Sequence, residues 1–354
     1  MDSFLKKMRK NMEKEIILKK IYNGKFITQN ESFFLFDCII ENQLNLIELT
    51  SVIIAMKVRG ETPEEITGAA IAILRKAKKF PSPNYDFADI VGTGGDSGNN
   101  INISTASAFV AATCGVKIAK HGNISNTRLG SFNLLQKLGI NINITAEQSR
   151  FFLDHINLCF LFSNNYHFIF QNIQNIRQTI KVKTIFNILG PLINPARPKL
   201  GLIGVYHPFL LLPVAKTLQL LGYKRAIVVN SGNIDKVSLH KITQIVEVQG
   251  EKIFSYQVSP ENFGLPFYSR SFFYKNTDEQ NYEIFIKILQ GKSDKFYEEL
   301  IAINVALLLK LFNHEDLYEN AKWALQVIRS GESYKKVLQL TEKNNEQHNF
   351  RYNY

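Results

Sequence analysis

The sequence predicts an α/β protein that has a small all-helical N-terminal domain and a large domain with a mostly parallel central sheet flanked by helices. Two patterns support this prediction. Apolar residues before about residue 79 recur at helical spacing, whereas after residue 86 short apolar runs typical of strands alternate with helical segments. The chain has 354 residues, of which 45% are apolar and 21% charged, so it can form two domains and is not mainly disordered.

The helical domain is expected to span residues 1–85. Leu49, Val52 and Met56 illustrate the helical spacing, and Thr62-Pro63-Glu64-Glu65 has the capping hydroxyl, proline and acids typical of a helix start. Prolines shortly before residue 85 end this pattern, so residues 86–354 are predicted to form the α/β domain. Helical spacing in residues 166–192 predicts that this segment folds back onto the opening helices.

Strands and helices are predicted to alternate along the large domain. Strands are expected at residues 87–91, 116–119, 158–162 and 225–229, and helices at residues 106–114, 128–137 and 209–221. The C-terminal part is expected to be helical at residues 279–292, 294–312 and 317–340. Such alternation is typical of a parallel sheet whose strands are connected by helices.

The formal net charge of +11 raises the question of a nucleic-acid or membrane partner. Seven basic residues crowd the first 20 positions, a distribution typical of a solvated helix face. The three cysteines are far apart and lack the short paired spacing of zinc sites, which is typical of thiols in a reducing compartment. The N-terminus lacks the apolar stretch of a signal peptide and no apolar run is long enough to span a bilayer, so we expect a cytoplasmic protein.

Three segments combine glycine, hydroxyl, amide or basic residues near strand ends and a helix start. They are Gly92-Thr93-Gly94-Gly95-Asp96, Asn102-Ile103-Ser104-Thr105 and Lys120-His121-Gly122-Asn123. Glycine lets backbone N–H groups approach a phosphate closely, and a helix N-terminus favours an anion. Because ligands of parallel sheets bind at the carboxyl ends of the strands, these segments predict a phosphate-rich pocket. Each segment alone also fits an ordinary tight turn, helix cap or strand end.

Together with Thr184–Pro195, these segments resemble the anthranilate phosphoribosyltransferases. Weaker similarities are Arg59–Ile66 and Ser259–Gly264, and all of them follow the family's order from about residue 20 to residue 340. The resemblance implies transfer of the 5-phosphoribosyl group from phosphoribosyl pyrophosphate to the amino group of anthranilate, the second step of the tryptophan branch. It also implies Mg²⁺ as cofactor and a homodimer formed through the helical domain, with no membrane or nucleic-acid partner.

The resemblance also assigns roles to individual residues. The donor would be bound by Gly92, Thr93, Gly94, Gly95, Asp96, Asn102, Ser104, Thr105, Lys120 and Arg128. The acceptor would be bound by Gly92, Asn123, His167 and Arg177, and the metal by Ser104 and Asp235. The arginine can meet the acceptor carboxylate as a bidentate fork. Pyrophosphate is a good leaving group and the aromatic amine is neutral at neutral pH, so positioning and electrostatics suffice and no catalytic side chain is expected.

Two departures from the family's pattern lie in the donor region. The loop 124–130 is apparently one residue shorter, and Arg128 is expected to supply the missing charge from a shifted position. Asp235-Lys236 stands where the family has an Asp-Glu pair, and a protonated lysine cannot bind a metal ion. Either a magnesium site is lost or weakened, or Lys236 itself supplies positive charge near the pyrophosphate.

Two alternatives remain open at this stage. A divergent, non-catalytic or altered-acceptor relative could bind nucleic acid through its basic surface, which salt-dependent retention of DNA without donor turnover would reveal. A pyrimidine nucleoside phosphorylase would also combine helices with a phosphate-binding domain, although those chains are usually longer. Turnover of thymidine or uridine with phosphate would identify the second class.

Overall fold

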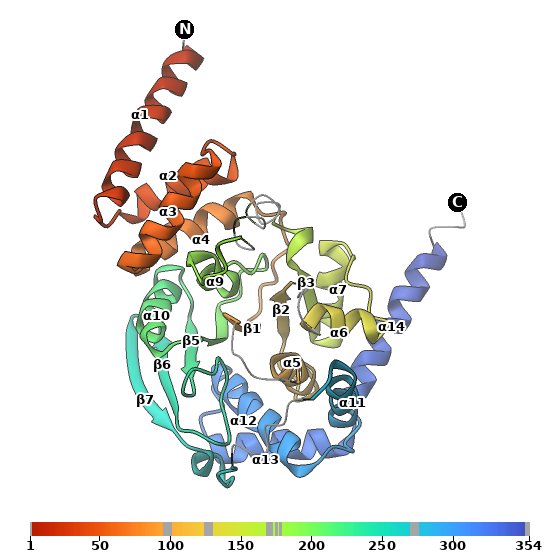
Figure 1. Ribbon diagram of the computed structural model, residues 1–354. Coiled ribbons are helices and arrows are strands. Elements are labelled where there is room, and N and C mark those ends of the chain that lie inside the picture. Colours follow the sequence, from red (N-terminus) through yellow and green to blue (C-terminus); the bar gives the residue numbers. More distant parts are fainter. Residues whose placement is uncertain are drawn as a thin grey trace.

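The computed structural model describes residues 2–94, 101–123, 130–167, 173, 176, 179–269 and 276–350, with backbone only at residues 2–7 and 343–350. Within this part the strands form one seven-stranded sheet with the order β3-β2-β1-β4-β5-β6-β7. The parallel strands are β1 (Ala88–Gly92), β2 (Ile118–Gly122), β3 (Leu158–Phe162), β4 (Leu200–Gly204) and β5 (Arg225–Asn230). Antiparallel β6 (Thr243–Gln249) and β7 (Lys252–Val258) complete it, so the prediction of a mostly parallel sheet is confirmed (Figure 1).

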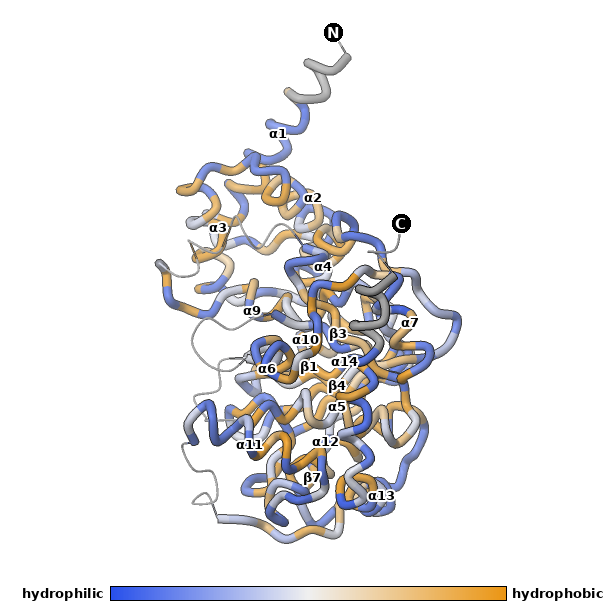
Figure 2. Tube along the Cα trace, turned by 90° about the vertical axis from the view of Figure 1, so that its right-hand side faces the viewer, coloured by the Kyte–Doolittle hydropathy of each residue, from blue (hydrophilic) through white to orange (hydrophobic). Residues whose placement is uncertain are grey.

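The N-terminal region is helical, as predicted. Its helices are α1 (Asp2–Tyr22), α2 (Gln29–Ile40), α3 (Leu46–Arg59) and α4 (Pro63–Lys76). The last three each begin with a capping box, in which the cap side chain and a side chain three residues later exchange hydrogen bonds with the backbone. The part of α1 that projects from the other helices is largely hydrophilic (Figure 2). Residues 77–87 contain no helix or strand and lead into β1.

Helices cover both faces of the sheet. They are α5 (Ile103–Thr113), α6 (Ser131–Lys137), α7 (Ala146–Ile156), α9 (Ile185–Leu189), α10 (Leu211–Leu220), α11 (Asp278–Leu289), α12 (Lys295–Leu311), α13 (Leu317–Ser330) and α14 (Ser333–Phe350). Short 3₁₀ turns lie at η1 (Ser163–Asn165), η2 (Gly190–Leu192), η3 (Pro208–Leu210) and η4 (Pro260–Phe263). Among these described helices none is long and apolar enough to cross a membrane.

Two apolar cores lie on opposite faces of the sheet. Neighbouring residues of β4 show the alternation, because Leu202 belongs to the core that contains α5 and α12 and Ile203 to the core that contains α10. The second core continues through α9 into α2, α3 and α4. The helical domain therefore packs against one face of the sheet through shared apolar side chains.

Three element boundaries differ from the predictions. β2 spans residues 118–122 instead of 116–119, so Lys120 and His121 lie within the strand and not after it. α5 begins at residue 103 instead of 106, which places Ser104 and Thr105 in its first turn. The predicted helix over 317–340 is two helices, because Gly331 ends α13 in the left-handed conformation with φ 71°. The β6–β7 hairpin was missed because β7 is largely exposed and does not show an apolar run.

Candidate active site

The carboxyl ends of the five parallel strands form one edge of the sheet, here called the carboxyl edge. The register aligns Gly92 of β1 with Gly204 of β4, and Gly204 with Val229 of β5. Beyond β1 the chain is held against the neighbouring strand: Thr93 donates its N–H to the Gly204 carbonyl at 2.9 Å and accepts a hydrogen bond from Tyr206 N–H at its Oγ1 at 3.0 Å. Gly94 has φ 70°, which glycine adopts without strain. Residues 92–94, the glycine turn, are therefore placed at this edge.

Asp235 comes from the loop after β5 and lies directly on the glycine turn. Its side chain is buried, and its Oδ2 accepts a hydrogen bond from Gly94 N–H at 2.9 Å. A Cβ at Gly92 would lie 2.2 Å from Asp235 Oδ2, and a Cβ at Gly204 would lie 1.6 Å from the Asp235 carbonyl oxygen. Glycine at both positions is thus what lets this loop approach the ends of β1 and β4.

Lys120 is buried beneath the same turn, with 3% of its surface exposed. Its Nζ donates to the Ile90 carbonyl at 2.7 Å. Burial lowers the pKa of Lys120, while the negative charge of Asp89 opposes that shift. Asp89 is buried as well and accepts a hydrogen bond from Asn194 Nδ2 at 2.8 Å, and burial raises the pKa of Asp89 to about 6. A buried pair of opposite charges therefore underlies the carboxyl edge.

The N-terminus of α5 reaches the same edge, because a helix that connects parallel neighbours β1 and β2 runs back across the sheet from the carboxyl ends. Asn102 is the N-cap residue, but its side chain makes no capping hydrogen bond. Ser104 is half-buried in the first turn, and the hydroxyl of the buried Thr105 has no hydrogen-bond partner within the described residues. The backbone N–H groups of this turn and the nearby hydroxyls are suited to an anion.

A cavity of about 190 Å³ adjoins the glycine turn. Its lining includes Gly92, Thr93, His121, Asn123, Phe186 and Ile193. The apolar side chains and the backbone of the turn make it suitable for a small aromatic molecule that carries a polar group. The edge of the sheet thus combines an anion-binding surface with a small, partly apolar pocket.

His167 lies behind His121 and is not among the residues that line this cavity. The two rings meet edge to face, with centroids 5.3 Å apart. His167 Nε2 lies 2.8 Å from the Ile193 carbonyl oxygen and therefore donates its proton to it. Burial lowers the pKa of His167 to about 4, and burial together with His167 lowers the pKa of His121 well below its ordinary value. Both imidazoles are therefore neutral at neutral pH.

Comparisons with known proteins match this architecture over nearly the whole chain. The family described as "Glycosyl transferase family, a/b domain" matches residues 84–334, and the corresponding helical bundle domain matches residues 15–77. The anthranilate phosphoribosyltransferase of Erwinia tasmaniensis is 53% identical over 92% of this chain and 99% of its own length. The Serratia proteamaculans enzyme is 50% identical over 93% of this chain and 99% of its own. The chain belongs to the anthranilate phosphoribosyltransferase family.

Solved structures of this family agree with the fold. The anthranilate phosphoribosyltransferase from Thermus thermophilus superposes with a TM-score of 0.86 at 29% identity, covering 92% of this chain and 98% of the other. The Saccharomyces cerevisiae anthranilate phosphoribosyltransferase, solved in complex with PRPP and Mg, gives a TM-score of 0.83 at 26% identity and covers 93% and 97% of the two chains. The predicted fold class and family are thereby confirmed.

The structure brings together some of the residues to which the family resemblance assigned a binding role. Gly92, Thr93, Gly94, Lys120 and Asp235 meet at the carboxyl edge, and Asn123 lines the adjoining cavity. Gly95, Asp96, Arg128 and Arg177 lie outside the described residues, so their predicted roles stay predictions.

Sequence reasoning assigned no role to several polar residues beneath this candidate site. Asn194 Nδ2 donates to both Asp89 Oδ2 and the Ala119 carbonyl, each at 2.8 Å, and so ties the chain after η2 to β1 and β2. Lys183 Nζ lies 3.6 Å from the centre of the Tyr206 ring, next to the glycine turn. The motif Thr184–Pro195, which contains Asn194, was the sequence signal for this network.

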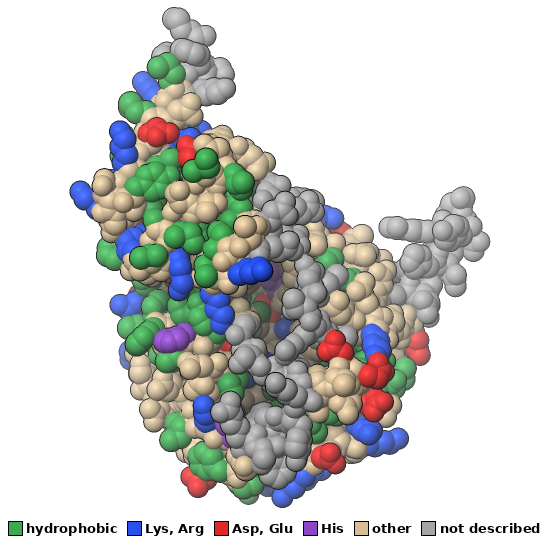
Figure 3. Space-filling view, in the orientation of Figure 1, with side chains coloured by type: hydrophobic (Ala, Val, Ile, Leu, Met, Phe, Trp, Pro, Cys, Tyr) green, Lys and Arg blue, Asp and Glu red, His purple; other side chains and the backbone are tan. Residues whose placement is uncertain are grey.

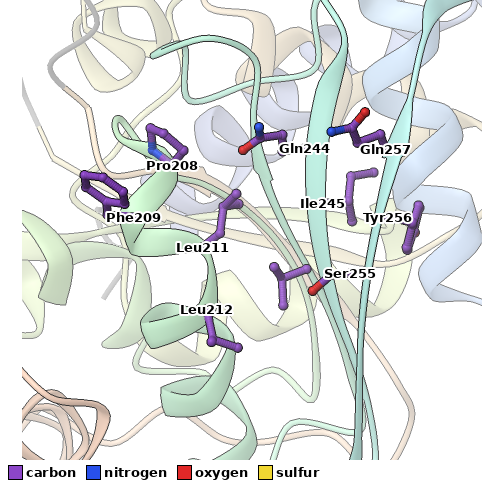
Figure 4. Close-up of a pocket in the computed structure, with 10 residues that line it drawn as sticks. Pro208, Phe209, Leu211, Leu212, Gln244, Ile245, Ser255, Tyr256 and Gln257 are labelled. Carbon is purple, nitrogen blue, oxygen red and sulfur yellow. The ribbon is translucent and has the colours of Figure 1, made fainter.

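Another groove, of about 480 Å³, lies away from the candidate site. It runs between η3, α10 and the β6–β7 hairpin (Figure 4). Its lining includes Phe209, Leu211, Leu212, Gln244, Tyr256 and Gln257, and none of the predicted site residues. The small cavity at the glycine turn is therefore the better candidate for the acceptor.

The folding stability of this phosphoribosyltransferase is expected to depend on His167 in acid. The folded-state pKa of His167 is lowered to about 4, so between its ordinary value of 6.5 and 4 the unfolded chain binds a proton that the folded chain does not. The contribution of His167 to the free energy of unfolding is fully present above pH 6.5 and is lost as pH falls toward 4. Its size is at most about 3 kcal/mol. His167→Gln, which can still donate to the Ile193 carbonyl, should flatten the dependence in urea unfolding measured across this window.

The matched control is His155→Gln, because His155 is exposed on α7. It should reproduce the wild-type pH dependence. A His167→Gln variant whose stability falls as steeply as that of the wild type would show that His167 does not titrate as stated.

Proposed function

We propose that this chain transfers the 5-phosphoribosyl group from phosphoribosyl pyrophosphate to the amino group of anthranilate, giving N-(5-phosphoribosyl)anthranilate and pyrophosphate, the second step of the tryptophan branch. The identity of 53% with an anthranilate phosphoribosyltransferase supports the activity. The observation that carries the proposal is the carboxyl edge, where the glycine turn, Lys120 and Asp235 adjoin a cavity of about 190 Å³. This arrangement offers one place for a phosphorylated sugar and another for a small aromatic amine.

The reaction needs no covalent intermediate. The bond between C1 of the ribose and the pyrophosphate oxygen breaks, and its electron pair leaves with pyrophosphate. The nitrogen lone pair of the neutral amine forms the new C1–N bond, and the nitrogen then releases a proton to the solvent or to pyrophosphate. Backbone N–H groups of the glycine turn and of the first turn of α5, together with the Lys120 ammonium, would stabilise the charge that develops on the leaving group.

The proposed binding residues form one set for the donor and one set for the acceptor. Donor contacts are assigned to Gly92, Thr93, Gly94, Gly95, Asp96, Asn102, Ser104, Thr105, Lys120 and Arg128. Acceptor contacts are assigned to Gly92, Asn123, His167 and Arg177. For His167 the proposal is an indirect contact, because its ring packs behind His121, and His121 faces the cavity.

Mg²⁺ is proposed as the cofactor, as in the yeast relative solved with PRPP and Mg. The protein ligands would be the Ser104 hydroxyl and the Asp235 carboxylate, both hard oxygen donors. The described residues contain no cluster of three or more acidic, histidine or cysteine side chains that could hold a metal. This fits Mg²⁺, which is usually bound by one or two carboxylates with substrate phosphates and water, and which would offset the charge of pyrophosphate.

The assay follows the loss of anthranilate fluorescence on mixing with phosphoribosyl pyrophosphate while Mg²⁺ is titrated. Loss of signal that requires both the donor and the metal is the expected result. Fluorescence that stays constant with all three components present would contradict the proposal. Parallel samples with thymidine or uridine plus phosphate, and with a DNA column at rising salt, test the two alternative classes.

We also propose that the chain forms a homodimer through its helical domain. Apolar side chains of α3 are exposed to solvent, with Leu46 at 66%, Ile47 at 79% and Val58 at 82%. Figure 3 shows hydrophobic side chains gathered over this domain. An exposed apolar patch of this kind is typical of a surface that packs against a partner.

The variant Ile47→Glu/Val58→Glu is expected to sediment as a monomer under conditions in which the wild type sediments as a dimer, because two buried carboxylates would oppose each other across the interface. Leu338→Glu on α14, which replaces an exposed leucine far along the chain, is the control and should leave the dimer intact. Sedimentation velocity measures the oligomeric state, and a dimeric double variant would place the interface elsewhere.

A cytoplasmic location is also part of the proposal, and cell fractionation followed by immunoblotting tests it.

A further inference from the structure

Lys236 places a positive charge directly on the carboxylate of Asp235. Its Nζ lies 2.5 Å from Asp235 Oδ1, and the side chains of the two residues are 14% and 2% exposed. The other oxygen of this carboxylate, Oδ2, accepts the N–H of Gly94. These contacts hold the ammonium at the glycine turn.

The loop that carries Lys236 is fixed from both sides. Ser231 Oγ donates to the Lys236 carbonyl at 2.6 Å, and Ser231 N–H donates to the Ile234 carbonyl at 3.0 Å. The next residue, Val237, exchanges hydrogen bonds with the side chain of Asn304 on α12 at 3.3 and 3.2 Å. Since the backbone cannot withdraw, the ammonium moves only as far as rotation of its own side chain allows.

Two ammonium groups and two carboxylates of the described residues lie around this position. Lys236 disfavours the charged form of the buried Lys120, while Asp235 favours it. The second acidic group, Asp89, also favours the charged form of Lys120 and is bound by Asn194. An ammonium group held at an anion-binding turn is suited to a ligand with several negative charges.

An ammonium can replace a metal ion at such a position in one respect. An ammonium has three donors, so in a donor complex it can bind phosphate oxygens and a carboxylate at the same time. It supplies one positive charge that is present before the donor binds, whereas a divalent ion must be recruited from solution. A lysine at this place therefore neutralises phosphate charge without requiring metal.

We propose that Lys236 is a built-in counter-cation for the pyrophosphate group of the donor, so that the donor complex of this chain holds one divalent ion fewer than that of a variant with a carboxylate at position 236. The inference rests on the proposed function, since it assigns Lys236 to the same donor. Lys236 is a substrate-binding residue in this proposal, and the divalent ion that remains lies with the Ser104 hydroxyl, the Asp235 carboxylate and the donor phosphates.

Metal ions can be counted directly. Mn²⁺ replaces Mg²⁺, the enzyme is in excess over phosphoribosyl pyrophosphate, and the loss of the free Mn²⁺ signal in electron paramagnetic resonance gives the number bound for each donor. One Mn²⁺ is expected for the wild type and two for Lys236→Glu. Two ions in the wild type, or one in both proteins, would overturn the proposal.

Donor affinity without metal is the second readout. Calorimetric titration with phosphoribosyl pyrophosphate in EDTA should show about tenfold or more weaker binding for Lys236→Met than for the wild type, and near wild-type binding for Lys236→Arg. Lys241→Met is the matched control, because Lys241 belongs to the same region but is exposed and directed at the Gly232 carbonyl. Thermal melting of each variant shows that it is folded. Equal affinity of Lys236→Met and the wild type in EDTA would also overturn the proposal.

Failure of the inference can be distinguished from failure of the proposed function. A wild-type protein that neither binds nor turns over phosphoribosyl pyrophosphate in excess Mg²⁺ would refute both. A wild-type protein that turns over the donor normally with two bound Mn²⁺ would refute only the role of Lys236.

Discussion

Lys120→Met is expected to lower kcat/KM for phosphoribosyl pyrophosphate by about 10²- to 10³-fold, because it removes a fixed charge that stabilises the leaving group. The Lys120 ammonium is buried at the carboxyl edge and donates to the Ile90 carbonyl, so it is in place before the donor binds. Its loss also leaves the buried Asp89 without the positive charge that favours ionisation, which raises the pKa of Asp89 further. Steady-state kinetics with the donor as varied substrate measures the effect.

Lys117→Met is the control for this substitution. Lys117 precedes β2, and its Nζ donates to the carbonyls of Leu153 and Asp154 at 3.1 and 3.0 Å, away from the carboxyl edge. This variant should lose stability and keep the wild-type kcat/KM. If Lys120→Met retained kcat/KM within about threefold of the wild type, Lys120 would have no part in stabilising the leaving group.

Gly204→Ala is expected to destabilise the fold by about 3 kcal/mol and to weaken donor binding. The added Cβ would lie 1.6 Å from the carbonyl oxygen of Asp235, and neither side can give way easily. Gly204 lies in β4 between β1 and β5, and the Asp235 loop is held by Ser231 and Asn304. Urea unfolding measures the change in the free energy of unfolding. Calorimetric titration measures the loss of donor affinity that displacement of Asp235 and Lys236 would cause.

Gly190→Ala provides the stability control, because a Cβ at Gly190 would meet no atom within 4 Å and its φ of −47° suits alanine. This variant should unfold at nearly the wild-type urea concentration. Wild-type stability in Gly204→Ala would mean that the loop can move away from β4, and the fixed position of Lys236 would then be wrong as well.

Four of the five parallel strands were predictable because each is a short apolar run, whereas β4, whose run is interrupted by glycine, was not predicted. Leu158–Phe162 is buried at every position and ends at polar residues, so its bounds could be predicted from the pattern alone. Lys120 and His121 were assigned to a loop because polar residues seldom continue a buried strand. They lie in β2 because tertiary contacts satisfy them: Asp89 accepts the His121 N–H, and the Ile90 carbonyl accepts the Lys120 ammonium.

The candidate site was predictable only where its residues form short motifs. The glycine turn is one such motif, and the Asp235-Lys236 pair is adjacent in sequence. The hydrogen bond between Asn194 and Asp89 joins residues that are 105 positions apart, and no local pattern in a single sequence indicates it. The same is true of the contact between Gly204 and the Asp235 carbonyl, which depends on the order of the strands.

The apolar core shared by the N-terminal helices and the sheet determines how the chain can be divided. Met56 of α3, Ile73 of α4, Val214 of α10 and Val228 of β5 belong to one cluster. A fragment that began at residue 86 would expose the apolar side chains on the α10 side of the sheet to water and would tend to precipitate. The helical segment and the catalytic sheet are therefore expected to melt together in one calorimetric peak, and neither half should be purified alone as a soluble piece.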